Sequence, residues 1–198
     1  MIQNIVLRNH TKFWDSFVKI GEFYGSGRST FIFPAGFYLS GLLFNDSEIR
    51  TTGRILFESL LISGLTVQII KIVSGRARPY LGEGPYSFNP FIFKNDYHSF
   101  TSGHTVVAFT ISSVLSARFK NVYASIGLYL LATLSAYQRM YSDNHWFSDT
   151  FLSAAIGIAV GNAFVTVNEE RDTNKNNNLS IMPYYNPYST GIMISYTF

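Results

Sequence analysis

The sequence predicts an all-α fold: a six-helix bundle with an N-terminal amphipathic helix, about five strongly apolar or membrane-spanning helices, and a short C-terminal tail resembling a β-hairpin. Charged residues make up only 14% of the 198 residues, whereas a typical soluble domain contains roughly 25%. Long stretches carry no charge at all, among them Thr30 to Asn45, Asn121 to Gln138 and Thr150 to Asn168. The last two approach the roughly 20 residues that cross a bilayer.

The first helix is expected from Thr11 to Tyr24, where apolar residues recur at helical spacing with charges between them, the pattern of an amphipathic helix. The apolar helices are expected at Thr30 to Asn45, about Ile55 to Val73, Gly103 to Ala117, Asn121 to Gln138 and Thr150 to Asn168. A polar turn is expected from Asp46 to Arg54. Gly157 and Gly161, about one turn apart in the last helix, predict close contact with a neighbouring helix.

The segment from Gly75 to Phe100 is expected to be irregular, because its prolines exclude a long helix. A loop of this length in a compact protein is usually functional. Its many aromatic residues are expected either to cover a substrate or to lie at a lipid interface. Within this loop, we expect Arg76 to shape the backbone or to line the mouth of a site, and His98 to lie near that site.

The composition divides the chain into a helical domain over residues 1–168, a polar linker over 169–178 and a β-like tail over 179–198. In the tail, apolar residues alternate from Ile192 to Phe198, the pattern of a strand in a hairpin. The first residues lack the layout of a signal peptide, which leaves two readings: insertion through an internal span, or a leader that was removed.

The charge and the cysteine count exclude several classes of function. A net charge of +3 without a run of basic residues does not fit a nucleic-acid partner. The absence of cysteine excludes disulfides and thiolate chemistry.

Three polar clusters lie at the ends of the expected apolar helices: Lys71 to Pro79, Thr101 to His104, and Gln138 to Asp149. Helices that alternate in direction bring all three junctions to the same end of an up-and-down bundle. The sequence therefore predicts one site built from these clusters.

Such a site has the chemistry to bind phosphate. Lys71, Arg78 and Arg139 supply positive charge, and guanidinium groups match phosphate oxygens. Ser102 and Gly103 begin a helix, where unpaired N–H groups and the helix dipole favour an anion. The same groups suit the charge that spreads over the oxygens of a phosphoryl-transfer transition state.

Two histidines are expected to divide the work at this phosphate. Asp149 follows His145 by four residues, a spacing that lets the carboxylate orient the imidazole, so His145 is the expected nucleophile. His104 is the expected general acid that protonates the leaving oxygen. No carboxylate cluster indicates a metal, and the surrounding cations would repel one, so neither a metal nor a cofactor is expected.

These clusters resemble the three motifs of the type-2 phosphatidic acid phosphatase family, which shares its core with bacterial acid phosphatases and vanadium haloperoxidases. The first motif, a Lys, six residues and Arg-Pro, matches from Lys71 to Pro79. The second is Pro-Ser-Gly-His, with Thr101 in place of Pro; the third is Ser-Arg, five residues, His, three residues and Asp, with Gln138 in place of Ser. The resemblance implies a metal-independent phosphatase with a phosphohistidine intermediate on His145.

The leading expectation is a bacterial membrane enzyme that hydrolyses a phosphomonoester or pyrophosphate on a lipid: phosphatidic acid, phosphatidylglycerophosphate, a polyprenyl pyrophosphate or a lipid A type phosphate. Its partners are then the lipid substrate and the membrane; the oligomeric state stays open. Basic residues in the loops opposite the site (Arg50, Arg54, Arg118 and Lys120) predict that the site faces the periplasm or exterior.

Three alternatives remain at this point. A soluble or peripheral periplasmic acid phosphatase with the same core fits a mean hydropathy of only +0.13. A vanadate-dependent haloperoxidase would need a vanadate and peroxide pocket, of which the sequence gives no sign. A non-catalytic lipid-binding membrane protein is disfavoured by the complete set of charged and histidine positions.

Overall fold

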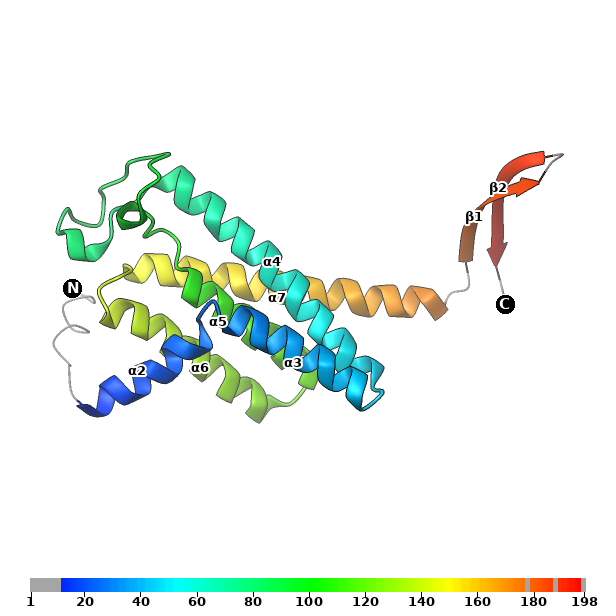
Figure 1. Ribbon diagram of the computed structural model, residues 1–198, viewed down its shortest axis with the longest axis horizontal. Helices are drawn as coiled ribbons and strands as arrows, with labels where there is room; N and C mark the ends of the chain where they lie inside the picture. The colour runs from blue at the N-terminus through cyan, green and yellow to red at the C-terminus, as the bar shows by residue number, and fades with distance from the viewer. Residues whose placement is uncertain (1–11, 177–178, 187–188, 197–198) are drawn as a thin grey trace.

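The computed structural model describes residues 12–176, 179–186 and 189–196. Within this part of the chain, six α-helices form the bundle that the sequence predicts (Figure 1). They are α2 (Lys12–Tyr24), α3 (Ser29–Leu43), α4 (Ser47–Ser74), α5 (Gly103–Phe119), α6 (Val122–Tyr141) and α7 (Phe147–Asn176). Short 3-10 helices, η1 (Pro79–Leu81) and η2 (Asn95–Tyr97), lie in the long loop between α4 and α5.

Helix α5 is the centre of the bundle and packs against α4, α6 and α7, whereas α2 lies on α6 and α3 on α4. It is buried on most sides, which requires its polar side chains to find partners inside the protein. Ser112 donates to the carbonyl of Leu128 on α6 at 2.8 Å, and Ser113 donates to the carbonyl of Ile158 on α7 at 3.1 Å. These bonds fix how α5 sits against both neighbours.

The close helix contact predicted at Gly157 and Gly161 is present between α7 and α5. A Cβ atom at Gly157 would lie 2.9 Å from the Cβ of Phe109, and one at Gly161 would lie 2.8 Å from the Cβ of Ser113. Any larger side chain would therefore push the two helices apart. This contact sets how closely the middle of α7 approaches α5.

Two helix boundaries differ from the expectation. Within the expected turn from Asp46 to Arg54, the residues from Ser47 onward are helical, because the Asp46 carboxylate accepts hydrogen bonds from the backbone N–H groups of Glu48 (2.8 Å) and Ile49 (3.0 Å) and so caps α4. Helix α7 was expected to end at Asn168 but continues to Asn176, so most of the expected linker is helical. Glu, Arg and Lys in this stretch are good helix formers, and Glu169 pairs with Lys120 at 3.0 Å.

The C-terminal residues form the hairpin that the alternating pattern predicts, although Phe198 lies outside the described residues. Strand β1 (Leu179–Asn186) pairs antiparallel with β2 (Ser189–Tyr196), with Leu179 opposite Tyr196 and Asn186 opposite Ser189. The hairpin follows the end of α7 (Figure 1).

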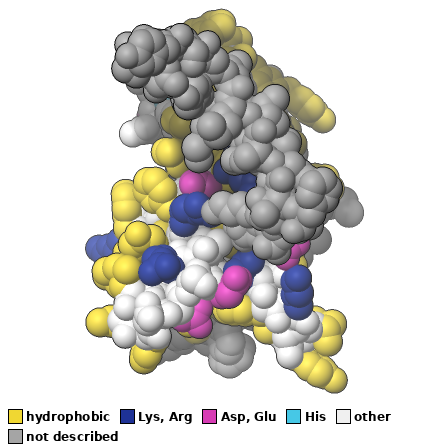
Figure 2. Space-filling model, turned by 90° about the vertical axis from the view of Figure 1, so that its right-hand side faces the viewer, with side chains coloured by type: hydrophobic (Ala, Val, Ile, Leu, Met, Phe, Trp, Pro, Cys, Tyr) yellow, Lys and Arg dark blue, Asp and Glu magenta, His cyan; other side chains and the backbone are white. Residues whose placement is uncertain are grey.

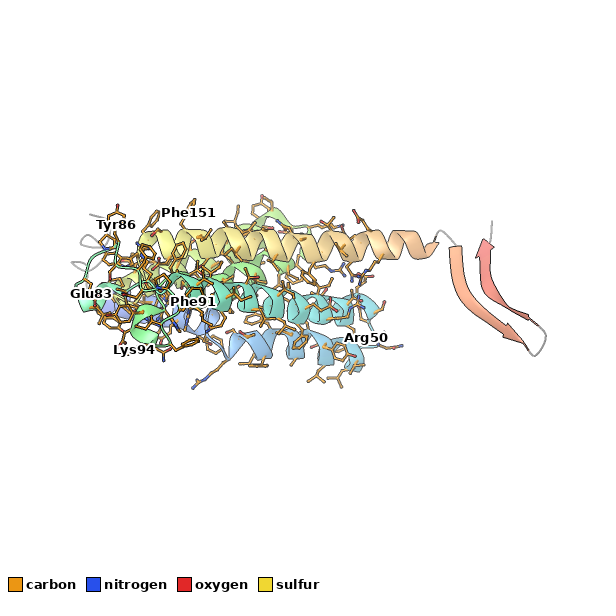
Figure 3. All side chains as sticks on the ribbon, turned by 90° about the horizontal axis from the view of Figure 1, so that it is seen from above. Arg50, Glu83, Tyr86, Phe91, Lys94 and Phe151 are labelled. Carbon is orange, nitrogen blue, oxygen red and sulfur yellow. The ribbon has the colours of Figure 1, made fainter. Side chains whose placement is uncertain are left out.

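Two described helices, α4 and α7, are long and apolar enough to cross a membrane. Only 33% and 28% of their most apolar windows are buried, whereas the core helix of a soluble protein is mostly buried. Large apolar side chains are exposed along both: Ile69 is 62% exposed on α4 and Phe151 67% on α7. In Figure 3, Phe151 points away from the bundle. The bundle therefore presents apolar surface to its surroundings along its length.

Candidate active site

The structure brings all eight predicted site residues to one end of the bundle. Lys71 lies in the last turn of α4 and Arg139 in the last turn of α6. Ser102, Gly103 and His104 form the N-terminus of α5. Arg78 and His145 lie in the adjoining loops, and Asp149 lies in the first turn of α7. The long loop between α4 and α5, which carries Glu83 and Lys94, covers the same end, opposite Arg50 (Figure 3).

His145 is held in one tautomer by a backbone group. Its side chain is buried, and its Nδ1 lies 2.6 Å from the carbonyl oxygen of Ser99. Because a carbonyl only accepts hydrogen bonds, Nδ1 must carry the proton. The lone pair on Nε2 is then available to attack an electrophile, as a nucleophilic role requires.

His145 and Asp149 were expected to pair directly on one helical face, but the structure arranges them differently. His145 precedes α7 instead of lying on it, and Asp149 Oδ2 is 3.8 Å from Nδ1, beyond hydrogen-bond length. The carboxylate instead accepts a hydrogen bond from the Ser99 hydroxyl at 2.5 Å. Asp149 therefore acts on the imidazole through its charge and by fixing Ser99, which contacts both residues.

Asp149 also organises the start of α7. It is fully buried, and its Oδ2 accepts a hydrogen bond from the backbone N–H of Trp146 at 2.9 Å. This is the reciprocal half of a capping box, in which the third helical residue reaches back to the N-cap. One carboxylate thus fixes both the helix end and the loop that presents His145.

Arg76 forms a buried ion pair with Asp149. Its Nη1 donates to Asp149 Oδ1, and its Nε and Nη2 donate to the carbonyl of Pro85 at 2.9 and 2.6 Å. The guanidinium lies over the rings of Phe88, Phe100 and Trp146 at 5.4–5.7 Å. Arg76 was expected to shape the loop or line the mouth of the site; it does shape the loop, and it ties that loop to Asp149.

The N-terminus of α5 is arranged around Ser102. Its hydroxyl oxygen caps the helix by accepting from the Thr105 backbone N–H at 3.3 Å and from the Thr105 hydroxyl at 3.0 Å. Its own N–H donates to Ser153 Oγ at 2.7 Å and is no longer available to an anion. A Cβ on Gly103 would lie 3.7 Å from Lys71 Nζ, so the ammonium group sits beside this helix end. Lys71 therefore reinforces the positive end of the α5 dipole.

Arg78 and Arg139, the two arginines expected to bind phosphate, are held by different contacts. Arg78 is oriented on two sides, with Nε donating to the carbonyl of Asn95 at 2.9 Å and Nη1 to Asn144 Oδ1 at 3.0 Å. Arg139 donates to Gln138 Oε1 at 3.2 Å, but its buried Nε has no hydrogen-bond partner among the described residues. A buried donor without a partner is costly, and an anion bound here would supply the missing acceptor.

His104 shares the electrostatic environment of this cluster. Burial lowers the pKa of its imidazole to about 4, helped by the charges of Arg139, His145, Lys71 and Arg78. The same set of charges acting on one ring shows how closely the three motifs meet. Burial also lowers the pKa of His145 to about 4, against the nearby Asp149 carboxylate, which raises it. Both imidazoles are therefore neutral near pH 7.

Sequence reasoning missed Ser99, Asn144 and Ser153, because neighbouring polar residues in a loop or helix give no sign that they orient another side chain. His98 was expected near the site. Its Nε2 lies 2.9 Å from the carbonyl of Ile92, so it braces the loop. Among the described residues, no group of three or more His, Asp or Glu side chains is placed to hold a metal ion.

Comparisons with known proteins point to one family. The model of the PAP2 superfamily matches residues 52–172, which include all eight predicted site residues. The chain is 30% identical over 110 residues to a lipid A 1-phosphatase of Rhizobium etli, covering 53% of this chain and 45% of that protein. It is 32% identical over 66 residues to a lipid A 1-phosphatase of Porphyromonas gingivalis, covering 32% of this chain and 15% of that protein. The matches thus span less than half the length of these relatives.

Among solved structures, the crystal structure of Aquifex aeolicus LpxE resembles this chain with a TM-score of 0.65 and 25% sequence identity. The match covers 83% of this chain and 93% of that one. The likeness therefore extends over most of the helical bundle.

Proposed function

The chain belongs to the PAP2 superfamily, and we propose that it is a metal-independent lipid phosphatase that releases phosphate from a membrane lipid through a phosphohistidine on His145. The observation that carries this proposal is the tautomer of His145. Its Nδ1 is committed to the Ser99 carbonyl, which leaves Nε2 as the nucleophile, and the charges of Lys71 and Arg139 act on the same imidazole. A soluble acid phosphatase is less well supported, since apolar side chains are exposed along α4 and α7.

The proposed reaction has two displacements. In the first, His145 Nε2 forms a bond to phosphorus while the bond to the leaving oxygen breaks, and His104 gives that oxygen a proton. In the second, His104 takes a proton from water, whose oxygen attacks phosphorus and releases His145. Lys71, Arg78 and Arg139 stabilise the charge on the phosphoryl oxygens in both steps. These cations supply the charge compensation that Mg²⁺ provides in other phosphoryl-transfer enzymes.

A lipid A type phosphate is the best-supported substrate, because the curated relatives are named lipid A 1-phosphatases. Phosphatidic acid, phosphatidylglycerophosphate and a polyprenyl pyrophosphate present the same terminal phosphate and are the alternatives within this class. A site at the end of an apolar bundle suits a lipid, whose head group lies at the membrane surface while its chains stay in the bilayer.

The end of the bundle opposite the site carries Lys and Arg side chains among acidic ones (Figure 2). Arg118 and Lys120 belong to this end, where they pair with Glu48 and Glu169. The positive-inside tendency counts basic residues and is little affected by acidic ones. We therefore propose that this end faces the cytoplasm and that the active site faces the periplasmic or exterior side of a bacterial membrane.

The pH profile is expected to reflect the two lowered pKa values. His145 must be neutral to attack, so kcat/KM rises as the pH increases through about 4. His104 must be protonated to serve as an acid, so kcat/KM falls above its free-enzyme pKa of about 4. A bound phosphate offsets the neighbouring cations and raises the pKa of His104. The alkaline limb of kcat should therefore lie at a higher pH than that of kcat/KM.

Steady-state kinetics between about pH 3 and about pH 9 would measure both limbs, because this range extends about one pH unit below the lowered histidine pKa values and above the usual range of His and phosphate. An optimum of kcat/KM in the acidic range and an upward displacement of the kcat limb are expected. Coincident limbs, or an optimum of kcat/KM above neutrality, would contradict the assignment of His104 as the acid.

Phosphate release by purified protein from a panel of lipid phosphates tests the proposed function directly. Activity should persist in excess EDTA and should be inhibited by vanadate, which occupies a phosphoryl site as a trigonal bipyramid. Loss of activity in EDTA with recovery on adding Mg²⁺ would show that the cations do not replace a metal. No release from any lipid phosphate would refute the substrate class.

A further inference from the structure

A polar cavity opens beside His104, whose imidazole also feels the charges of Lys71, Arg78 and Arg139. Its volume is about 360 Å³. Helix α2, the turn that follows it and the start of α5 contribute its lining residues: Lys19, Glu22, Phe23, Ser26, Arg28 and His104. It thus adjoins His104, the predicted general acid, whereas its other lining residues lie outside the three motifs.

The turn after α2 is held against the active site by a close backbone contact. A Cβ atom on Gly25 would lie 2.5 Å from the carbonyl oxygen of His104 and 2.2 Å from Ser135 Oγ. Only glycine allows this approach, so the position of the turn relative to His104 is fixed by the sequence. The backbone that carries Glu22 and Arg28 on either side of Gly25 is consequently held in place against the general acid.

The cavity carries unpaired charge of both signs. Lys19, Glu22 and Arg28 are exposed, and none of them forms an ion pair with another described residue. Glu22 also lies near enough to Arg139 for its charge to raise the pKa of that guanidinium, which burial and then Arg78 lower to about 10. The cavity is therefore electrostatically continuous with the phosphate site.

The position of His104 determines what such a cavity receives. The general acid stands at the oxygen that leaves with the rest of the substrate, so a group that enters a cavity lined by His104 belongs to the leaving group. Two cations suit a second anionic group, and a carboxylate accepts hydrogen bonds from hydroxyl groups. A purely apolar or small leaving group would leave these charges unused.

We propose that Lys19, Glu22 and Arg28 form a leaving-group subsite that binds a phosphorylated sugar or polyol head group. The proposal builds on the proposed function, because it takes His104 as the group facing the leaving oxygen. It assigns substrate selection to α2 and the turn after it, whereas the three motifs perform the chemistry that is common to all substrates of the site.

Binding measurements on a catalytically inactive background separate the subsite from turnover. On the His145→Ala background, calorimetry in detergent would compare inorganic phosphate with glucose 1,6-bisphosphate. The bisphosphate is expected to bind about tenfold more tightly or better, as one added charge-assisted contact allows. The combined Lys19→Ala and Arg28→Ala substitutions should remove that advantage and change phosphate affinity less than about threefold. Arg50→Ala, at the opposite end, is the matched control.

Each outcome decides the proposal. Selective loss of bisphosphate affinity in the double variant, with the Arg50→Ala control unaffected, supports it. Equal binding of the two ligands, or equal losses for both in the double variant, overturns it. Failure of the proposed function would appear separately, as wild-type protein that releases no phosphate from lipid substrates while the binding difference persists.

Discussion

His145→Ala is expected to abolish phosphate release, with kcat lowered on the order of 10⁴–10⁶-fold, the range seen when an enzyme loses its nucleophile. The substitution removes Nε2, the ring nitrogen of His145 whose lone pair stays available because Nδ1 is bound to the Ser99 carbonyl. The three cations remain, so inorganic phosphate should still bind. Steady-state kinetics on a lipid phosphate, with phosphate binding measured on the same preparation, would separate the two effects.

His98→Asn is the matched control for this prediction, since it changes a buried histidine at the same end of the bundle. The His98 imidazole hydrogen-bonds to the Ile92 carbonyl and has no place in the proposed reaction. Most of the activity should therefore remain. Near-normal phosphate release by His145→Ala, or equal losses in both variants, would remove His145 from the role of nucleophile.

Arg76→Ala is expected to have the largest effect on stability, costing about 3–5 kcal/mol, because it leaves a buried carboxylate without its ion-pair partner. Arg76 and Asp149 pair at side chains that are 7% and 0% exposed. The loop should also loosen, since the hydrogen bonds to Pro85 are lost. Chemical denaturation in detergent, together with kcat, would measure both consequences.

Arg118→Ala provides the comparison for Arg76→Ala. Arg118 also pairs with a carboxylate, but its partner Glu48 is 75% exposed, so the loss should be about 1 kcal/mol or less. Adding Asp149→Asn to Arg76→Ala should recover part of the stability, because the unpaired buried charge is then gone. If Arg76→Ala and Arg118→Ala lowered the free energy of unfolding by similar amounts, burial would not be the reason that the Arg76–Asp149 pair stabilises the fold.

The architecture was largely predictable because apolar periodicity and charge-free stretches determine which residues form helices. The six helices, the hairpin and the close contact at Gly157 and Gly161 follow from such local patterns. The errors lie where polar residues continue a helix. Asp46 caps α4 earlier than expected, and Glu169 begins a further two turns of α7.

The candidate site was predictable only in part, for a related physical reason. The residues that we propose to contact phosphate belong to fixed motifs, whereas the groups that orient them are ordinary polar residues brought close by folding. Ser99 lies outside all three motifs, yet its carbonyl sets the tautomer of His145. Arg76 falls within the first motif, but only the fold reveals that its partner is Asp149, 73 residues away in sequence. The cavity at Lys19 and Arg28 likewise depends on how α2 packs.

The stereochemistry of phosphoryl transfer tests the proposed reaction most directly. The substrate would carry a phosphate that is chiral through oxygen isotopes. The wild-type protein would transfer this phosphoryl group to an acceptor alcohol, and the configuration at phosphorus would be determined in the product. Attack by His145 followed by transfer from the phosphohistidine inverts phosphorus twice and predicts net retention. Net inversion would mean a single direct displacement, and it would contradict a phosphohistidine on His145.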